Sequence, residues 1–151
     1  MRRAQPSESR ELAAWIAERH YIPGLPPAYR FALEFIEGKR RIGAMLLGLP
    51  PREMDQVRWM ALTRMCFVDD TAHCIESQGL AIMRKFVRTW VPATRALIAY
   101  SDPAQGHEGT VYEADGWAPM GLTKTDNKGF TTRPGRTQVV SSRKRRWVRT
   151  P

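Results

Sequence analysis

The stretch VRWMALTRMCF, residues 57–67, is the longest strand-like run in the chain and decides the fold. With a period of two, its odd-numbered residues face one side of a sheet and its even-numbered residues, including Arg64, face the other. Apolar residues recur at helical spacing over residues 72–90, and residues 95–100 form a short apolar strand. A long strand that feeds a helix and then another strand predicts a parallel crossover.

The rest of the chain predicts further elements around this unit. A helix is expected over residues 6–21, followed by two strands at 29–36 and 41–49 that a tight turn joins into a hairpin. A short helix is expected within residues 106–117, and one or two edge strands follow from Ala118. Together these elements predict an α/β fold (an α+β mixed sheet), in which a central mixed β-sheet is flanked by helices.

Positive charge is concentrated at the C-terminal end. The chain has 151 residues, with 24 Lys and Arg against 15 Asp and Glu, for a formal net charge of +9. Every charged residue from Arg133 onward is basic. The length fits one domain, so the pattern predicts a catalytic domain over residues 1–132 and a basic arm over residues 133–151.

Such an arm suits a polyanion, because each phosphate that it neutralises releases condensed counterions. An aromatic residue among the arginines could also stack on a base. The nucleic-acid-binding residues expected on this basis are Arg133, Arg136, Arg143, Lys144, Arg145, Arg146, Trp147 and Arg149. The alternative is a solvated tail that only aids solubility.

No apolar run has the length that crosses a bilayer, and no apolar stretch follows Arg2 and Arg3. Neither a membrane partner nor a secretion signal is therefore expected. Only two cysteines are present, Cys66 and Cys74, so a disulfide framework is not expected and a cytoplasmic location is.

Several polar residues stand where chemistry could occur. Asp102 follows a predicted parallel strand, at the sheet edge where ligands bind, although an Asp before Pro also starts turns. His107, in a glycine-flanked loop, could be a general base, a metal ligand or a surface residue. Ser77 could cap a helix or present its hydroxyl to a substrate. Tyr112 could pack in the core, and His20 could be a C-terminal cation of its helix.

Arg64 is costly to bury among apolar neighbours unless it is paired, for instance with Asp102. Metal binding is weakly supported, because the candidate ligands lack the paired spacing of a zinc site. These candidates are His20, Cys66, His73, Cys74 and His107. Phosphate-binding glycine motifs and a serine nucleophile elbow are absent from the sequence.

Short pieces spread along the chain form a recognisable combination. They are His20-Tyr21, Leu62-Thr63-Arg64-Met65, Glu76-Ser77, Tyr100-Ser101-Asp102, Gly106-His107, Gly109-Thr110-Val111-Tyr112 and Gly116-Trp117. Their order and spacing resemble the Mom family of phage DNA-modification proteins, which have a GNAT (acetyltransferase-like) fold. The resemblance covers roughly residues 10–125, the whole expected core, and excludes the basic arm.

In that family the exocyclic amine of adenine in DNA receives a methylcarbamoyl group, which protects phage DNA from host restriction enzymes. The resemblance implies such an enzyme in the host cytoplasm, acting on double-stranded DNA with the adenine flipped out. Asp102 would accept or orient the amine proton with His20 as an alternative base, and Arg64 would hold Asp102 or stabilise the carbonyl. The full set of implied catalytic residues is Asp102, His20, Tyr21, Arg64, Ser77 and Tyr112. The oligomeric state stays open, with a homodimer as one alternative.

The implied cofactor is acetyl-CoA or a related acyl donor, bound by Ser77, Gln78, Gly79 and His107. The sequence departs from the usual glycine-rich loop before the long helix, because residues 70–79 hold only one glycine together with acidic side chains that would repel a diphosphate. A metal is an alternative source of unusual chemistry. Two other functions stay open: a GNAT-type N-acetyltransferase acting on a small-molecule or protein amine, and a non-enzymatic DNA-binding protein.

Overall fold

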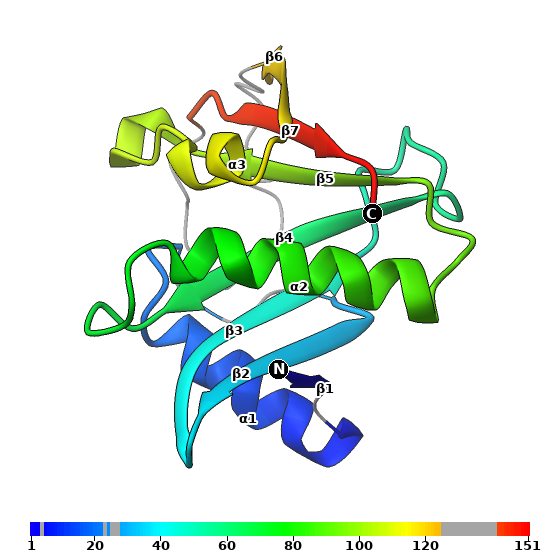
Figure 1. The fold of residues 1–151 in the computed structure, drawn as a ribbon. Coiled ribbons are helices and arrows are strands. Elements are labelled where there is room, and N and C mark those ends of the chain that lie inside the picture. Colours follow the sequence, from blue (N-terminus) through cyan, green and yellow to red (C-terminus); the bar gives the residue numbers. More distant parts are fainter. Residues whose placement is uncertain (4, 23, 25–27, 125–141) are drawn as a thin grey trace, which may run out of the picture.

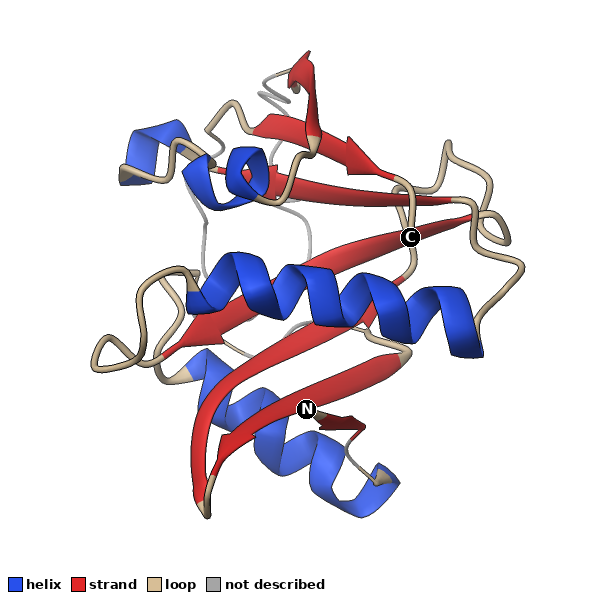
Figure 2. Cartoon of the chain, viewed as in Figure 1, coloured by secondary structure: helices blue, strands red, loops and turns tan. Residues whose placement is uncertain are grey.

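One mixed β-sheet runs through the centre of the protein, with helices on both faces (Figures 1 and 2). The computed structural model describes residues 1–3, 5–22, 24, 28–124 and 142–151. Within these residues seven strands pair in the order β1-β2-β3-β4-β5-β7-β6. The strands are β1 (Arg2–Arg3), β2 (Phe31–Glu37), β3 (Arg40–Gly48), β4 (Trp59–Phe67), β5 (Ala96–Ser101), β6 (Ala118–Leu122) and β7 (Arg145–Arg149). The helices are α1 (Pro6–Ala17), α2 (Ile75–Trp90) and α3 (Thr110–Ala114), with a 3₁₀ turn at Pro103–Gln105.

The two faces of the sheet carry separate apolar cores. α1 packs on one face through Leu12 and Ile16, which meet Leu46 of β3. α2 and α3 cover the other face, where Leu80 and Met83 belong to a larger cluster (Figure 2). Each helix turns its apolar stripe to the sheet, as the helical spacing predicts. The predicted mixed α/β fold is confirmed, with an antiparallel β2–β3 hairpin and a parallel β4–β5 crossover.

β4 and β5 stay together only at their beginnings. The parallel pairs run from Trp59↔Ala96 to Ala61↔Ile98, and no later pair joins the two strands among the described residues. β4 continues to Phe67 paired with β3, while β5 pairs with β7 on its other side. The strands therefore diverge and leave a slot in the middle of the sheet (Figure 1).

A β-bulge at Thr63 changes which side chains share a face of β4. Leu46 pairs with Arg64 and Leu47 with Leu62, so Thr63 is the extra residue. As a result Leu62 and Met65 both pack in the α2-side core, although their numbers differ in parity. The predicted strict alternation over residues 57–67 is wrong for this reason.

The last part of the predicted basic arm is a strand of the sheet. β7 lies between β5 and β6 and pairs antiparallel with both. Trp147 has 0% of its surface exposed in the larger core, so the prediction that it stacks on nucleic acid is wrong. Arginines flank it on both sides and mask the strand in the sequence, because their long stems can lie along the sheet while their charged heads reach polar partners.

Candidate functional site

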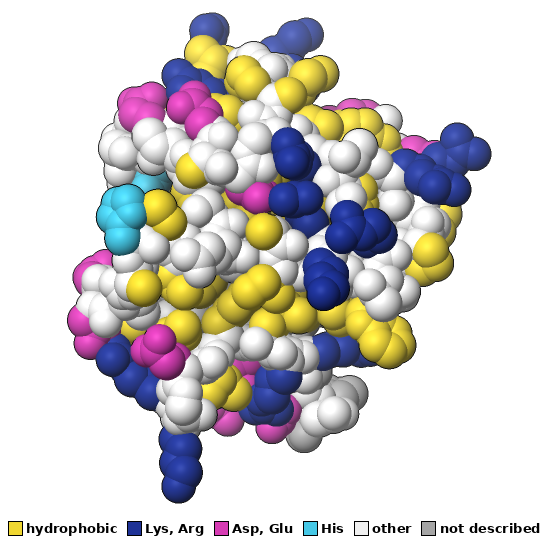
Figure 3. Space-filling view, in the orientation of Figure 1, with side chains coloured by type: hydrophobic (Ala, Val, Ile, Leu, Met, Phe, Trp, Pro, Cys, Tyr) yellow, Lys and Arg dark blue, Asp and Glu magenta, His cyan; other side chains and the backbone are white. Residues whose placement is uncertain are grey.

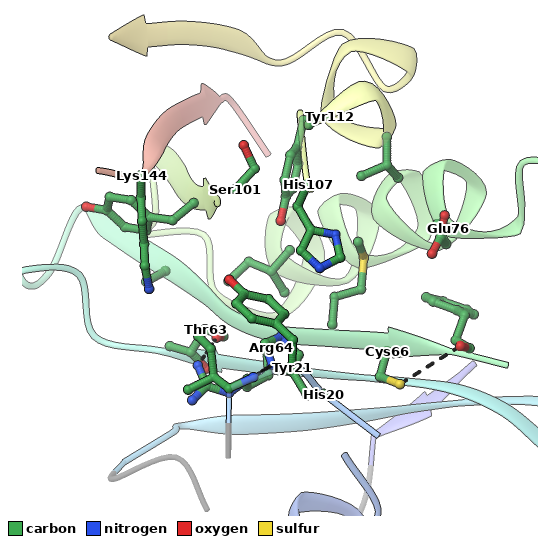
Figure 4. Close-up of a pocket in the computed structure, with 18 of the residues that line it drawn as sticks. His20, Tyr21, Thr63, Arg64, Cys66, Glu76, Ser101, His107, Tyr112 and Lys144 are labelled. Atoms are coloured by element: carbon green, nitrogen blue, oxygen red, sulfur yellow. Dashed lines mark hydrogen bonds between the residues drawn. The ribbon is translucent and has the colours of Figure 1, made fainter. Parts of the chain in front are cut away.

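A cavity of about 1040 Å³ fills the slot between β4 and β5 (Figure 4). Its walls come from the chain that follows α1, from β4 beyond the bulge, from the end of β5 and from the start of α3. The lining residues that the figure labels are His20, Tyr21, Thr63, Arg64, Cys66, Glu76, Ser101, His107, Tyr112 and Lys144. The structure thus brings together the predicted site residues His20, Tyr21, Arg64, His107 and Tyr112.

Three rings contact one another at the mouth of this cavity. His20 stacks on Tyr21 with 4.6 Å between centroids, and His107 lies tilted against Tyr21 at 4.7 Å. Tyr21 and His107 are exposed, so these rings border solvent. The pKa of the Tyr21 hydroxyl is raised, mainly because burial disfavours the phenolate and then because the charge of Asp102 repels it. The hydroxyl stays protonated and can donate a hydrogen bond.

His20 is held as a neutral imidazole. Burial lowers its pKa to about 4, and the positive charges of Arg64 and Lys144 act in the same direction. Its Nδ1 accepts a hydrogen bond from the backbone N–H of Ile22 at 3.1 Å, which leaves the ring proton on Nε2. This geometry makes His20 a hydrogen-bond donor and disfavours the base role expected from the sequence.

Tyr112 presents its hydroxyl from the opposite wall (Figure 4). Its ring stacks on Trp147 at 5.7 Å and meets the edge of Trp117 at 5.4 Å between centroids. Burial raises the pKa of the hydroxyl far above its ordinary value. The group is therefore protonated at neutral pH and can donate a proton or a hydrogen bond inside the cavity.

Trp147 supports this wall from behind. Its Nε1 donates a hydrogen bond to the Ser101 hydroxyl at 2.9 Å, and both side chains are buried. Gly109 crosses the indole with a φ of +92°, a conformation that favours glycine. Sequence reasoning missed Ser101 and this use of Trp147. The adjacent strand-forming residues Trp147 and Val148, set among the arginines, were the signal that could have found this strand.

Arg64 and Lys144 bring positive charge to the cavity. Burial lowers the pKa of both side chains, and the charge of Arg64 lowers that of Lys144 further while Asp102 opposes it. Arg64 Nη1 donates a hydrogen bond to the carbonyl of Thr63 at 3.1 Å. Within the described residues no ion pair joins Arg64 to Asp102, so the predicted pair is not formed there.

Asp102 closes a turn and does not line the cavity. It is 4% exposed, and its Oδ1 accepts a hydrogen bond from the backbone N–H of Ala104 at 3.1 Å. Its Oδ2 accepts another from the Ser142 hydroxyl. Both oxygens are thus used to fix the chain after β5 and before β7. The turn-forming alternative holds, and the expected contact with the adenine amine does not.

The predicted cofactor residues at the start of α2 do not line the cavity. Ser77 donates its hydroxyl to the carbonyl of Cys74 at 3.0 Å, and Gln78 is exposed. Gly79 is buried where a Cβ would come within 2.6 Å of the Phe67 ring, so it permits close packing of helix and sheet. The structure thus gives Ser77 a contact within the helix start and Gly79 a packing role, and it does not bring the three residues to the cavity.

The residues predicted to bind nucleic acid lie in different environments. Lys144 lines the cavity, Arg143 is exposed, and Trp147 is core. The other described ones contact backbone carbonyls: Arg145 that of Glu108, Arg146 that of Met120 and Arg149 that of Gly116. Arg133 and Arg136 lie outside the described residues. Figure 3 shows Lys and Arg side chains gathered between α2 and β7 on the face in view.

A preformed metal centre is not found in the part of the chain that the structure describes, where no three His, Cys, Asp or Glu side chains are grouped to hold an ion. His73 Nδ1 and Cys74 Sγ are 2.8 Å apart, and neither residue lines the cavity. No helix of these described residues has both the length and the apolar composition needed to span a bilayer.

Solved acetyltransferases share this fold. An N-acetyltransferase from Staphylococcus aureus Mu50 is 11% identical with a TM-score of 0.68, covering 99% of this chain and 96% of that one. A ribosomal-protein-alanine N-acetyltransferase from Brucella melitensis is 13% identical with a TM-score of 0.66, covering 99% and 98%. An aminoglycoside acetyltransferase solved with coenzyme A and kanamycin is 11% identical with a TM-score of 0.67, covering 99% and 92%. These similarities show a GNAT-like acetyltransferase fold.

The comparison with protein families identifies this chain more specifically than the shared fold does. A comparison with curated proteins gives no match. The Mom protein family, however, matches residues 4–150, which is nearly the whole chain and includes every wall of the cavity. This chain therefore belongs to the Mom protein family.

Proposed function

We propose that this protein transfers a methylcarbamoyl-type acyl group to the exocyclic amine of adenine in DNA and so protects the DNA from restriction enzymes. Family membership and the acetyltransferase fold support an acyl-transfer enzyme. The observation that carries the proposal is the cavity between the diverging strands β4 and β5. There an exposed imidazole, His107, and a buried, protonated phenol, Tyr112, stand on the walls of one site.

The acceptor base enters this cavity from outside the double helix. A base that is stacked in a duplex cannot reach an enclosed pocket, so it must flip out. The rings of His20, Tyr21 and His107 at the mouth offer aromatic surfaces on which a base can stack. The net charge of +9 attracts the polyanion to the protein.

A donor of the coenzyme A type fits this site in part. One structural neighbour was solved with coenzyme A. Among the described residues, the edge of β4 beyond Ala61 has no β5 partner, so its backbone groups can bind an extended acyl arm. The start of α2 forms no diphosphate cradle, because Glu76 lines the cavity and Gly79 is packed on Phe67. An activated acyl donor supplies the electrophilic carbonyl. The protein would bind this donor through its acyl arm and not through a diphosphate group.

The chain's own residues manage the protons of the transfer. A bond forms between the adenine nitrogen and the acyl carbon, and the bond from that carbon to its leaving group breaks. The amine proton passes to the imidazole of His107. His20 through Nε2 and Tyr21 through its hydroxyl donate hydrogen bonds to the carbonyl oxygen as it gains negative charge. Tyr112 gives its proton to the leaving group and takes one back from the His107 imidazolium, so both side chains end the transfer as they began it.

Restriction of plasmid DNA tests this function in cells. Plasmid from cells that express the chain should resist enzymes whose sites contain adenine, while Tyr112→Phe should leave the plasmid sensitive. Tyr29→Phe is the matched control, since the Tyr29 hydroxyl donates to the Ser9 carbonyl outside the cavity and its loss should keep the protection. Equal cleavage of all plasmids, with soluble protein in each culture, would contradict the proposal.

A second function is favoured by the acidic side chains of the cavity. Glu76 and Glu108 line it and would attract a cationic amine. The neighbours named for an aminoglycoside and for a ribosomal-protein alanine have such amines as substrates. The chain would then be an N-acetyltransferase acting on a small-molecule or protein amine. Acetylation of kanamycin by the purified protein, together with unmodified plasmid DNA, would favour this function.

A further inference from the structure

Two half-buried cations share one region of the cavity wall. Arg64 projects from β4 just after the bulge, and Lys144 leads into β7. In Figure 4 the Lys144 side chain extends toward the side of the cavity that holds Arg64 and Thr63. Burial disfavours the charge on each, and the charge of Arg64 adds to this effect at Lys144. The protein therefore holds two like charges where solvent screens them only in part.

No carboxylate forms an ion pair with either cation among the described residues. The negative charge of Asp102 acts on Lys144 and opposes the effect of burial there, but both Asp102 oxygens already accept hydrogen bonds from Ala104 and Ser142. Arg64 donates only to the carbonyl of Thr63 within the same residues. Among the described residues, much of the hydrogen-bond donor capacity of both side chains is therefore unused.

Partly buried arginines elsewhere in the protein are treated differently. Arg84 makes two hydrogen bonds of 2.8 Å to the carboxylate of Asp115. Arg41 Nε lies 2.5 Å from Glu34, whose side chain is 5% exposed. Arg84 and Arg41 are thus matched with acids, and Arg146 and Arg149 donate to backbone carbonyls. Arg64 differs from these four arginines because it lines the cavity, where an external anion can reach it.

We propose that Arg64 and Lys144 form a phosphate-binding site in the wall of the cavity. The planar guanidinium of an arginine can donate two parallel hydrogen bonds to phosphate oxygens. The flexible ammonium of a lysine binds phosphate as a point charge. The proposal deepens the proposed function, because a base that enters beside Tyr21 brings its own backbone phosphate to the mouth of the cavity. The phosphate of the acyl donor is the other source of the same chemistry.

Binding measurements on the full-length protein test the site without any turnover. The probes are inorganic phosphate, deoxyadenosine monophosphate, deoxyadenosine and coenzyme A. Their binding is measured by thermal unfolding and by calorimetry. Arg64→Gln and Lys144→Gln should each weaken the binding of deoxyadenosine monophosphate about ten-fold or more and leave the binding of deoxyadenosine unchanged. Inorganic phosphate should raise the unfolding temperature of the unmodified protein and lose this effect in both variants.

Matched controls separate the site from the general charge of the protein. Arg58→Gln and Lys85→Gln remove the same charges from exposed positions outside the cavity and should keep full phosphate binding. Arg64→Lys should restore part of the affinity that Arg64→Gln loses. Equal phosphate binding by all variants, or none by the unmodified protein, would overturn the site.

The probes also distinguish the two sources and the two proposals. Loss of nucleotide binding in the variants assigns the site to the acceptor, whereas loss of coenzyme A binding alone assigns it to the donor. Both results support the phosphate site. Nucleotide binding that depends on Arg64 and Lys144, with no modified adenine in DNA, would keep the site and refute the proposed function.

Discussion

The backbone of Gly109 passes so close to the indole of Trp147 that a Cβ on Gly109 would lie 2.3 Å from Cζ2 of the ring. The same indole binds the Ser101 hydroxyl and stacks on Tyr112. One buried side chain therefore fixes the end of β5, the loop of His107 and the start of α3. The wall of the cavity formed by these segments therefore depends on this contact.

Gly109→Ala tests this dependence. The added methyl group meets the indole and must adopt a φ of +92°, so the variant should lose about 1–3 kcal/mol of unfolding free energy and most DNA modification. Gly106→Ala is the control, because Gly106 also has a positive φ but nothing lies within 4 Å of its added Cβ. Chemical denaturation of the two variants measures the difference. Equal stability of both would show that the contact does not matter.

Stability should fall in acid because of His20. Its pKa is about 4 in the folded protein and near 6.5 when unfolded, so between these values the unfolded chain takes up a proton that the folded chain excludes. The loss from pH 6.5 to pH 4 should be about 1–2 kcal/mol after allowance for partial exposure of the ring. His20→Asn should flatten this part of the pH profile of unfolding. The exposed His73, changed to Asn, should leave the profile as it is.

The ion pair of Arg84 and Asp115 should carry much of the attachment of α2 to the α3 region. Asp115 also accepts a hydrogen bond from the Trp117 indole at 2.9 Å, and its side chain is 5% exposed. Asp115→Asn leaves Arg84 without its partner and should cost about 3 kcal/mol in denaturant unfolding. Asp70→Asn breaks the exposed pair with Arg40 and should cost less than about 1 kcal/mol. A similar cost at both sites would refute this ranking.

Removal of Arg64 should make the free protein more stable. Burial works against the charge of this side chain, and Arg64→Gln removes it while keeping a polar group that can still meet the Thr63 carbonyl. We expect a gain of roughly 2–4 °C in unfolding temperature, equivalent to about 1 kcal/mol for a chain of this size. Arg58→Gln should change it by less. A clear loss of stability in Arg64→Gln would show a structural role instead.

The sequence predicted the hairpin and the crossover because their apolar residues recur with the periods of strands and helices. It did not predict the bulge at Thr63, since an extra residue is defined by the partner strand and leaves no mark on the strand itself. The strand around Trp147 was hidden for another reason: arginines on both sides resemble a solvated arm when their carbonyl partners are distant in sequence.

The sequence predicted only some of the site residues. The family resemblance implied His20, Tyr21 and Tyr112 as site residues, and all three line the cavity. The hydrogen bonds of the Asp102 oxygens could not be predicted, because Ser142 lies 40 residues further along the chain and comes to this turn only where the chain leads into β7. Likewise Gly79 carries no sign in the sequence that a ring of β4 will occupy the space beside it.

The most direct measurement is mass spectrometry of the nucleosides of plasmid DNA from cells that express this protein. We expect a deoxyadenosine species heavier by one methylcarbamoyl group, present with the unmodified chain and with Tyr29→Phe and absent with Tyr112→Phe. Ordinary nucleosides alone, from cells that contain the soluble folded protein, would contradict DNA modification as its function.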